Sequence, residues 1–223
     1  MSIGDSNAAR AKILARIRKA QGRGASRPSR AESEAVGSYL KSHPRGPLPD
    51  VGGDLVARFR ERAESMQSTT EEIGREAQVP AAVARYLEAH HLPRSGCVWP
   101  ALAHLDWRGS GLDLAPRAAS GEDWVGVTGA FAAIAETGTL MTASGPDTPA
   151  SASLLPETHV AVVRAERIVA RMEEAWDLAR RAFGQLPRAV NFISGPSRTG
   201  DIEQQLVLGA HGPYRVHIII VRE

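Results

Sequence analysis

The chain has 223 residues, of which 43% are hydrophobic, 5% aromatic and 23% charged. This length is enough for one sizeable core, and the ordinary balance of apolar and charged residues excludes wholesale disorder. The single cysteine, Cys97, excludes a disulfide framework and any cysteine-ligated cluster or zinc site built from this chain alone, and we interpret it as a small buried apolar residue. We find no apolar run that could span a membrane or form the core of a signal peptide, so we expect a cytoplasmic protein.

The net charge of +2 is distributed unevenly along the chain. Residues 1–30 carry eight Arg or Lys and one Asp, which places +7 on this segment and leaves −5 on the remainder. Such a basic segment is either a solvated helix face or a surface that docks on an acidic partner. Nucleic acid is disfavoured as the main ligand, because the segment has no aromatic residue on which bases could stack.

The first elements in chain order are two helices. Ile13 and Ile17 belong to an apolar series at helical spacing, and a second, shorter helix is predicted over residues 33–41. Gly-, Pro- and Ser-containing stretches follow each of them. We therefore assign residues 1–50 to a basic helical arm with a flexible connector, and residues 51–223 to one α/β domain.

From residue 54 onward, predicted helices alternate with short apolar runs. The helices are expected near residues 54–63, 80–90, 168–183 and 199–208, with one or two helical turns in GAFAAIA at 129–135. The runs read as strands are GCVWP, GLDLAP, WVGVT, GTLMTAS, THVAVV, AVNFIS and VHIIIV. Several of these runs are apolar throughout, which is typical of strands buried on both faces. The sequence predicts an α/β fold with a mostly parallel central sheet flanked by helices.

Ser-Gly-Pro follows two of the predicted strands, at residues 144–146 and 194–196. Ligands of open α/β sheets bind beyond the carboxyl ends of the strands, so we place the candidate site at residues 194–203. Arg198 and a predicted helix start would attract a small anion there. Asp201 and Glu203 in the same turn oppose a plain anion site: they cap the helix, bind polar groups of a ligand or act in acid–base chemistry.

Glu136 ends the predicted helical turns, where an acidic side chain opposes the helix dipole. It is either an exposed residue beside a turn or a functional group acting as nucleophile, general base or hydroxyl ligand. His211, beside Gly212, is a further candidate, whereas His159 is interpreted as structural. The sequence has no spacing that indicates a metal site, no dinucleotide-binding glycine motif and no serine elbow.

The stretches VTGAFAAIAETGTL, LPETHVAVV and NFISGPSRTGDIEQQLVLGAHGPYRVHIIIV resemble the LUD-domain proteins, in particular their lactate-utilisation protein C branch. The resemblance implies a fold similar to the NagB/RpiA/CoA-transferase group. Its motifs include Glu136 and Asp201, which are the catalytic candidates. The ligand-binding candidates that it implies are Thr137, Gly138, Thr139, Ser194, Gly195, Ser197, Arg198, Thr199, Glu203, His211 and Gly212.

The resemblance further implies a role in oxidising L-lactate to pyruvate together with iron–sulfur partner proteins. In that reading the chain is an auxiliary or ligand-binding subunit with no cofactor of its own. Two alternatives remain open at this point. One is a stand-alone enzyme that acts on a CoA ester, folate or phosphorylated small molecule through a pocket containing Glu136. The other is a regulatory or nucleic-acid role of the basic arm.

Overall fold

The computed structural model describes residues 3–23, 27–202 and 205–223, and it divides into two compact units, Met1–Leu48 and Pro49–Glu223. The first unit contains α1 (Ile3–Ala20) and α2 (Arg30–Ser42), which confirms both predicted N-terminal helices. A capping box at Ser29 begins α2: the Ser29 hydroxyl accepts from the Glu32 N–H, and the Glu32 carboxylate accepts from the Ser29 N–H. No residue of α2 is buried.

The second unit is built on a six-stranded sheet in the order β1-β12-β7-β4-β2-β3. All of its strand pairs are parallel, which confirms the predicted mostly parallel central sheet. The strands are β1 (Thr69–Ile73), β2 (Ser95–Val98), β3 (Asp113–Pro116), β4 (Val125–Gly129), β7 (Thr158–Arg164) and β12 (Arg215–Val221).

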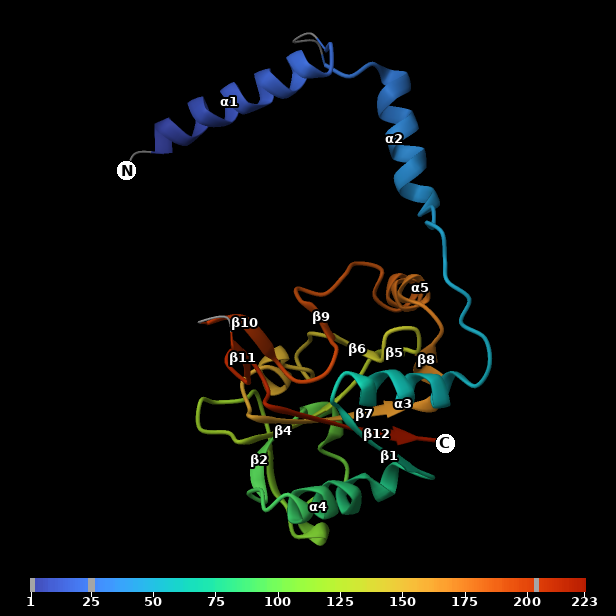
Figure 1. Ribbon diagram of the computed structural model, residues 1–223, viewed down its shortest axis with the longest axis vertical. Coiled ribbons are helices and arrows are strands. Elements are labelled where there is room, and N and C mark those ends of the chain that lie inside the picture. The colour runs from blue at the N-terminus through green and yellow to red at the C-terminus, as the bar shows by residue number, and fades with distance from the viewer. Residues whose placement is uncertain (1–2, 24–26, 203–204) are drawn as a thin grey trace. The chain divides into compact units, whose positions relative to one another are not determined.

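Two helices cover opposite faces of this sheet, α3 (Leu55–Ser65) and α4 (Val79–Ala89) (Figure 1). Along β12, Ile218 and Ile220 join the core cluster of α3, whereas Ile219 joins the cluster of α4. Successive side chains of a strand point to opposite faces, so a strand covered on both sides must be apolar throughout. This is why VHIIIV is apolar at every position except His217.

A second, four-stranded sheet has the order β8-β5-β6-β9 and is mostly antiparallel. Its strands are β5 (Ala132–Ile134), β6 (Thr139–Ala143), β8 (Ile168–Val169) and β9 (Val190–Ile193). Helix α5 (Met172–Phe183) packs on it through Ala175 and Ala179, which share a cluster with Met141. The predicted strands around residues 140 and 192 therefore exist, but they lie outside the parallel sheet.

Two helical predictions are wrong. Within GAFAAIA, residues Ala132–Ile134 form strand β5. Ala132 and Ile134 pack against α5, whereas Ala133 packs in the cluster of α3. Alternate side chains are therefore buried on opposite faces, which is the pattern of a strand. Where a helix was predicted over residues 199–208, the structure has two antiparallel strands, β10 (Arg198–Ile202) and β11 (Gln205–Leu208), called here the β10–β11 hairpin. The strand-to-helix turn expected after Ser194 is therefore absent, and a strand takes its place.

Two further differences from the predictions concern the start of a helix and an edge strand. The helix predicted over residues 168–183 begins at Met172, since Ile168–Val169 pairs with β5 as strand β8. Strand β1 was not predicted, because its sequence TTEEI carries two glutamates. Its Glu72 pairs with Arg60 at 2.7 Å, which is how an edge strand accommodates charge. None of the helices in the described part of the chain combines the length and apolar character needed to cross a membrane.

Candidate functional site

The structure brings the two sequence motifs, ETGT at residues 136–139 and SGPSR at 194–198, into contact. Strands β6 and β9 are antiparallel neighbours with Leu140 opposite Ile193. This register places Thr139 beside Ser194, and their hydroxyl oxygens lie 2.6 Å apart. The Thr137 hydroxyl donates to the Thr139 hydroxyl at 2.7 Å. Three hydroxyls from two distant segments thus form one hydrogen-bonded chain.

Both motifs also pack against the C-terminal end of α3. Gly138 and Gly195 have φ angles of +67° and +77°, which side chains rarely adopt. A Cβ atom at Gly138 would lie 2.3 Å from the backbone nitrogen of Ala63, and one at Gly195 would lie 2.1 Å from the carbonyl oxygen of Met66. Glycine is therefore required at both turns because the backbone of α3 and of the residue that follows it approaches so closely.

Two arginines bind backbone carbonyls at the same junction. Arg62 donates from Nε to the Glu136 carbonyl at 3.2 Å, and Arg198 donates from Nη2 to the Met66 carbonyl at 2.6 Å. A cation beside the last turn of α3 complements the helix dipole. Arg198 therefore has a structural partner, and the helix start that was expected to assist it in binding an anion is absent.

Glu136 lies in the hairpin turn between β5 and β6, closed by the Gly138 N–H donating to the Ile134 carbonyl at 2.9 Å. No helix ends at Glu136, so the prediction that its carboxylate opposes a helix dipole is wrong. The Glu136 side chain is half-buried, and its carboxylate forms no ion pair with any residue that the structure describes. Its proposed chemistry remains a prediction.

The other predicted site residues lie along the β10–β11 hairpin and the turn after it. The Ser197 carbonyl accepts from Gly209 at 2.9 Å, and a Cβ at Gly212 would lie 3.3 Å from the Ser197 Cβ. His211 is exposed in this turn, and no hydrogen bond or ion pair between described residues joins it to Glu136.

Three candidates remain, Thr199, Asp201 and Glu203. Thr199 is paired with Val207 in the ladder. Asp201 belongs to β10, and its side chain lies outside the described part of the structure, as does the whole of Glu203. Their predicted roles therefore stay predictions.

Two histidines are buried in the central sheet. His159 is fully buried, with Nε2 2.8 Å from the Thr128 hydroxyl, and burial lowers its pKa to about 4. His217 stacks on Tyr86 with a centroid distance of 4.0 Å, and burial, followed by the charge of His90, lowers its pKa to about 4. Both rings are neutral at neutral pH. The structural interpretation of His159 agrees with this burial.

Cys97 is also buried, and burial is the main reason that its pKa rises to about 11. A thiol with that pKa is inert as a nucleophile or metal ligand at neutral pH. Its interpretation as a small apolar residue is confirmed.

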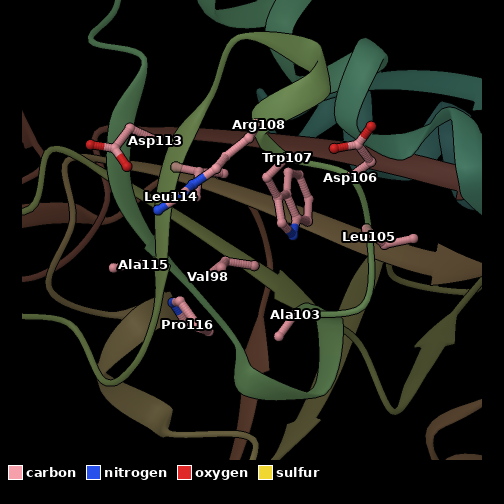
Figure 2. Close-up of a pocket in the computed structure, with 10 residues that line it drawn as sticks. All are labelled: Val98, Ala103, Leu105, Asp106, Trp107, Arg108, Asp113, Leu114, Ala115 and Pro116. Atoms are coloured by element: carbon pink, nitrogen blue, oxygen red, sulfur yellow. The ribbon is translucent and has the colours of Figure 1, made fainter.

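A pocket of about 390 Å³ flanks the edge strand β3. In Figure 2 the Arg108 side chain lies between Trp107 and Asp113. Trp107 donates from Nε1 to the Leu102 carbonyl at 2.9 Å, so its ring forms a fixed wall. The charged lining consists of one arginine and two aspartates, Asp106 and Asp113, which disfavours an anionic ligand. None of the motif residues lines this pocket.

Another hollow was missed from the sequence. It lies at the carboxyl ends of β4 and β7 and is lined in part by Arg164 and Arg167. The signal that could have revealed it is the run VVRAER, in which two arginines directly follow a predicted buried strand. The site was missed because strand ends were identified by Gly-Pro turns, and no such turn follows Val163.

Comparison with known proteins agrees with the motifs. The LUD domain model matches residues 117–221, which confirms the resemblance. Lactate utilization protein C of Bacillus subtilis (strain 168) is 40% identical over 102 residues, 44% of this chain and 42% of that protein. The protein of the same name from Exiguobacterium sp. (strain ATCC BAA-1283 / AT1b) is 39% identical over 121 residues, 53% of each chain. The chain thus spans about half the length of the curated relatives that it matches.

A solved structure, described as a DUF162 family protein from Deinococcus radiodurans, has a similar fold. Its TM-score is 0.58 at 25% identity, and the match covers 78% of this chain and 99% of that one. The α/β fold is confirmed by this likeness. The closer assignment to the NagB/RpiA/CoA-transferase group stays a prediction.

Proposed function

We propose that this protein is a component of an L-lactate utilisation system, and that it acts as an auxiliary or ligand-binding subunit. The observation that carries the proposal is the LUD domain match, which includes both the ETGT and SGPSR motifs, together with the likeness to proteins named lactate utilization protein C. Over this matched region the two motifs contact each other in the folded chain through Thr139 and Ser194.

The residue composition of the chain supports the proposal that electron transfer takes place in partner proteins. Oxidation of lactate to pyruvate removes two electrons, and an iron–sulfur cluster that accepts electrons needs several cysteine thiolates. This chain has one cysteine, Cys97, which is buried and has a raised pKa. We therefore assign electron transfer to iron–sulfur partner proteins, and binding or assembly to this chain.

The proposal is tested by reconstitution. The tagged protein is co-expressed under anaerobic conditions with the iron–sulfur proteins of the same lactate-utilisation system, and lactate-dependent dye reduction is measured with and without it. We expect the proteins to co-purify and the rate to depend on this chain, while the chain alone has no activity. Partners that oxidise lactate at the same rate without it, and that never co-purify with it, would overturn the proposal.

A second candidate is an enzyme that acts alone on a CoA ester, folate or phosphorylated small molecule. The observation that favours it is that the half-buried Glu136 directly precedes Thr137, the first residue of the hydroxyl chain formed with Thr139 and Ser194. A ligand at 100 times its Kd stabilises the folded state by about 2.7 kcal/mol, which a thermal shift detects. Glu136→Gln should abolish turnover of any ligand so identified, and the exposed Glu88→Gln should not. If none of these compounds raises the Tm, this candidate is rejected.

A further inference from the structure

The hollow at the carboxyl ends of β4 and β7, here called the β4–β7 pocket, has a volume of about 290 Å³. These two strands are neighbours in the middle of the parallel sheet, with Gly129 opposite Val162. The carboxyl ends of parallel strands are where open α/β sheets bind ligands. The lining residues are Glu76, Leu102, Gly129, Ala130, Phe131, Val162, Arg164, Glu166 and Arg167.

The first arginine of the pocket is engaged by a carboxylate. Arg164 donates from Nη2 to Glu76 at 2.7 Å, and the other oxygen of Glu76 lies 3.7 Å from Nε2 of His104. Glu76 is the first residue of the short 3-10 helix η1 (Glu76–Gln78), so this pair joins the end of β7 to a separate segment of the chain. The charge of Arg164 is therefore largely neutralised by Glu76, which also holds the side chain in place.

The second arginine is available to a ligand. The guanidinium carbon of Arg167 lies 5.6 Å from the centroid of the Phe131 ring, within the range of a cation–π contact. Arg167 forms no ion pair with any residue in the described ranges, and the contact with the ring does not use its N–H groups. A planar guanidinium held in this way offers two parallel donors to a carboxylate.

We propose that the β4–β7 pocket binds a small organic monocarboxylate, with Arg167 as the residue that anchors the carboxylate group. The volume corresponds to roughly ten water molecules, which suits a ligand of few atoms. Phe131, Leu102 and Val162 provide an apolar wall for the remainder of the ligand. These features belong to the pocket itself and hold whether or not the chain takes part in lactate utilisation.

The charges select a monoanion over a dianion. The two arginines and the two glutamates of the lining, Glu76 and Glu166, sum to zero, so any attraction for an anion comes from the local pair with Arg167 and not from the net charge. Because Arg164 is already paired with Glu76, Arg167 can neutralise one negative charge of a ligand, and the second charge of a phosphate dianion would stay uncompensated. The pocket beside β3 differs, since its single Arg108 faces two aspartates.

The test is titration calorimetry of the purified full-length protein with propionate, L-lactate and pyruvate as carboxylate probes. Inorganic phosphate and the neutral isostere propionamide are titrated in parallel. We expect at least one carboxylate to bind, and phosphate and propionamide to bind more weakly or not at all. The absence of binding by all three carboxylates overturns the inference, and so does tighter binding of phosphate or propionamide.

Variants then locate the site. Arg167→Gln should weaken carboxylate binding roughly tenfold to a hundredfold, the range for removing charge-assisted hydrogen bonds, and Arg167→Lys should lie between it and the parent protein. Arg108→Gln is the matched control, because it makes the same change at an exposed arginine of the other pocket and should leave binding unchanged. Both positions are exposed, so the variants should keep the fold, which circular dichroism confirms. Equal affinity in Arg167→Gln and the parent overturns the assignment of the site.

Discussion

Substituting Gly138 by alanine should destabilise the second unit of the chain more than a comparable substitution elsewhere. The left-handed backbone of Gly138, with φ of +67°, costs an alanine about 1–2 kcal/mol by itself. The added Cβ would also lie 2.3 Å from the Ala63 nitrogen and 2.5 Å from the Arg62 carbonyl carbon, whereas ordinary contact begins at 3.4 Å. Both are backbone atoms of a packed helix, so the turn or the helix must move by about 1 Å, and overpacking of this kind costs about 1–3 kcal/mol. We expect a total loss of about 2–5 kcal/mol.

The assay is urea unfolding followed by circular dichroism, with the free energy and the m-value compared between variants. Gly111→Ala is the matched control. Gly111 has φ of +74°, and the nearest atom to its added Cβ, at 3.2 Å, is Nη1 at the far end of the long Arg94 side chain and not a backbone atom. It should therefore lose only the backbone contribution, about 1–2 kcal/mol. If Gly138→Ala loses no more than Gly111→Ala, the close packing of the ETGT turn on α3 is refuted.

Three further predictions concern the core. Unfolded histidine titrates near pH 6.5 while His159 and His217 have pKa values of about 4, so stability should fall as the pH drops below 6.5, by about 2 kcal/mol per histidine at pH 5. Equal urea midpoints at pH 7 and pH 5 would contradict this, and His159→Gln should reduce the fall. Thr139→Val should cost about 1–2 kcal/mol in urea unfolding, because two hydrogen bonds are lost. Thr142→Val, on the same strand, should be neutral or stabilising, because its buried hydroxyl has no partner among the described residues, and the opposite order would refute the argument. Phe59→Ala in α3 should cost about 3–5 kcal/mol, and a loss under about 1 kcal/mol would show that α3 is not packed on the sheet.

The elements that could be predicted are those in which the spacing of apolar residues along one segment already shows which side chains are buried. The strand VHIIIV is apolar at every position but His217 because both of its faces are covered, and the helix with Val56, Phe59 and Ala63 has its buried residues at helical spacing. In both cases the period of the apolar residues identifies the element.

The missed part is where burial depends on a distant neighbour. The alanines of β5 favour a helix on propensity alone, and they form a strand because α5 lies on one side and the α3 cluster on the other. The hairpin β10–β11 was missed for a related reason, since its periodicity over four or five residues per strand is too short to separate strand from helix. The candidate anion site depended on that helix.

The geometry separates motif residues that hold the fold together from residues that remain available to a ligand. Gly138 and Gly195 are explained by backbone approach, Thr139 by its two hydroxyl partners, and Arg198 by its bond to the Met66 carbonyl. A resemblance carried by such residues therefore identifies the shared architecture, and does not by itself locate the chemistry.

Glu136 and Arg167 differ from these residues, because neither charged group has an ion-pair partner among the residues described. Substitution of a residue that holds the fold should lower the free energy of unfolding, whereas substitution of an available residue should change ligand binding at nearly constant stability. Measuring both quantities for Thr139→Val and Arg167→Gln distinguishes the two classes. If Thr139→Val alters binding without loss of stability, the motif itself contacts the ligand, and the functional centre lies at the hydroxyl chain and not at the β4–β7 pocket.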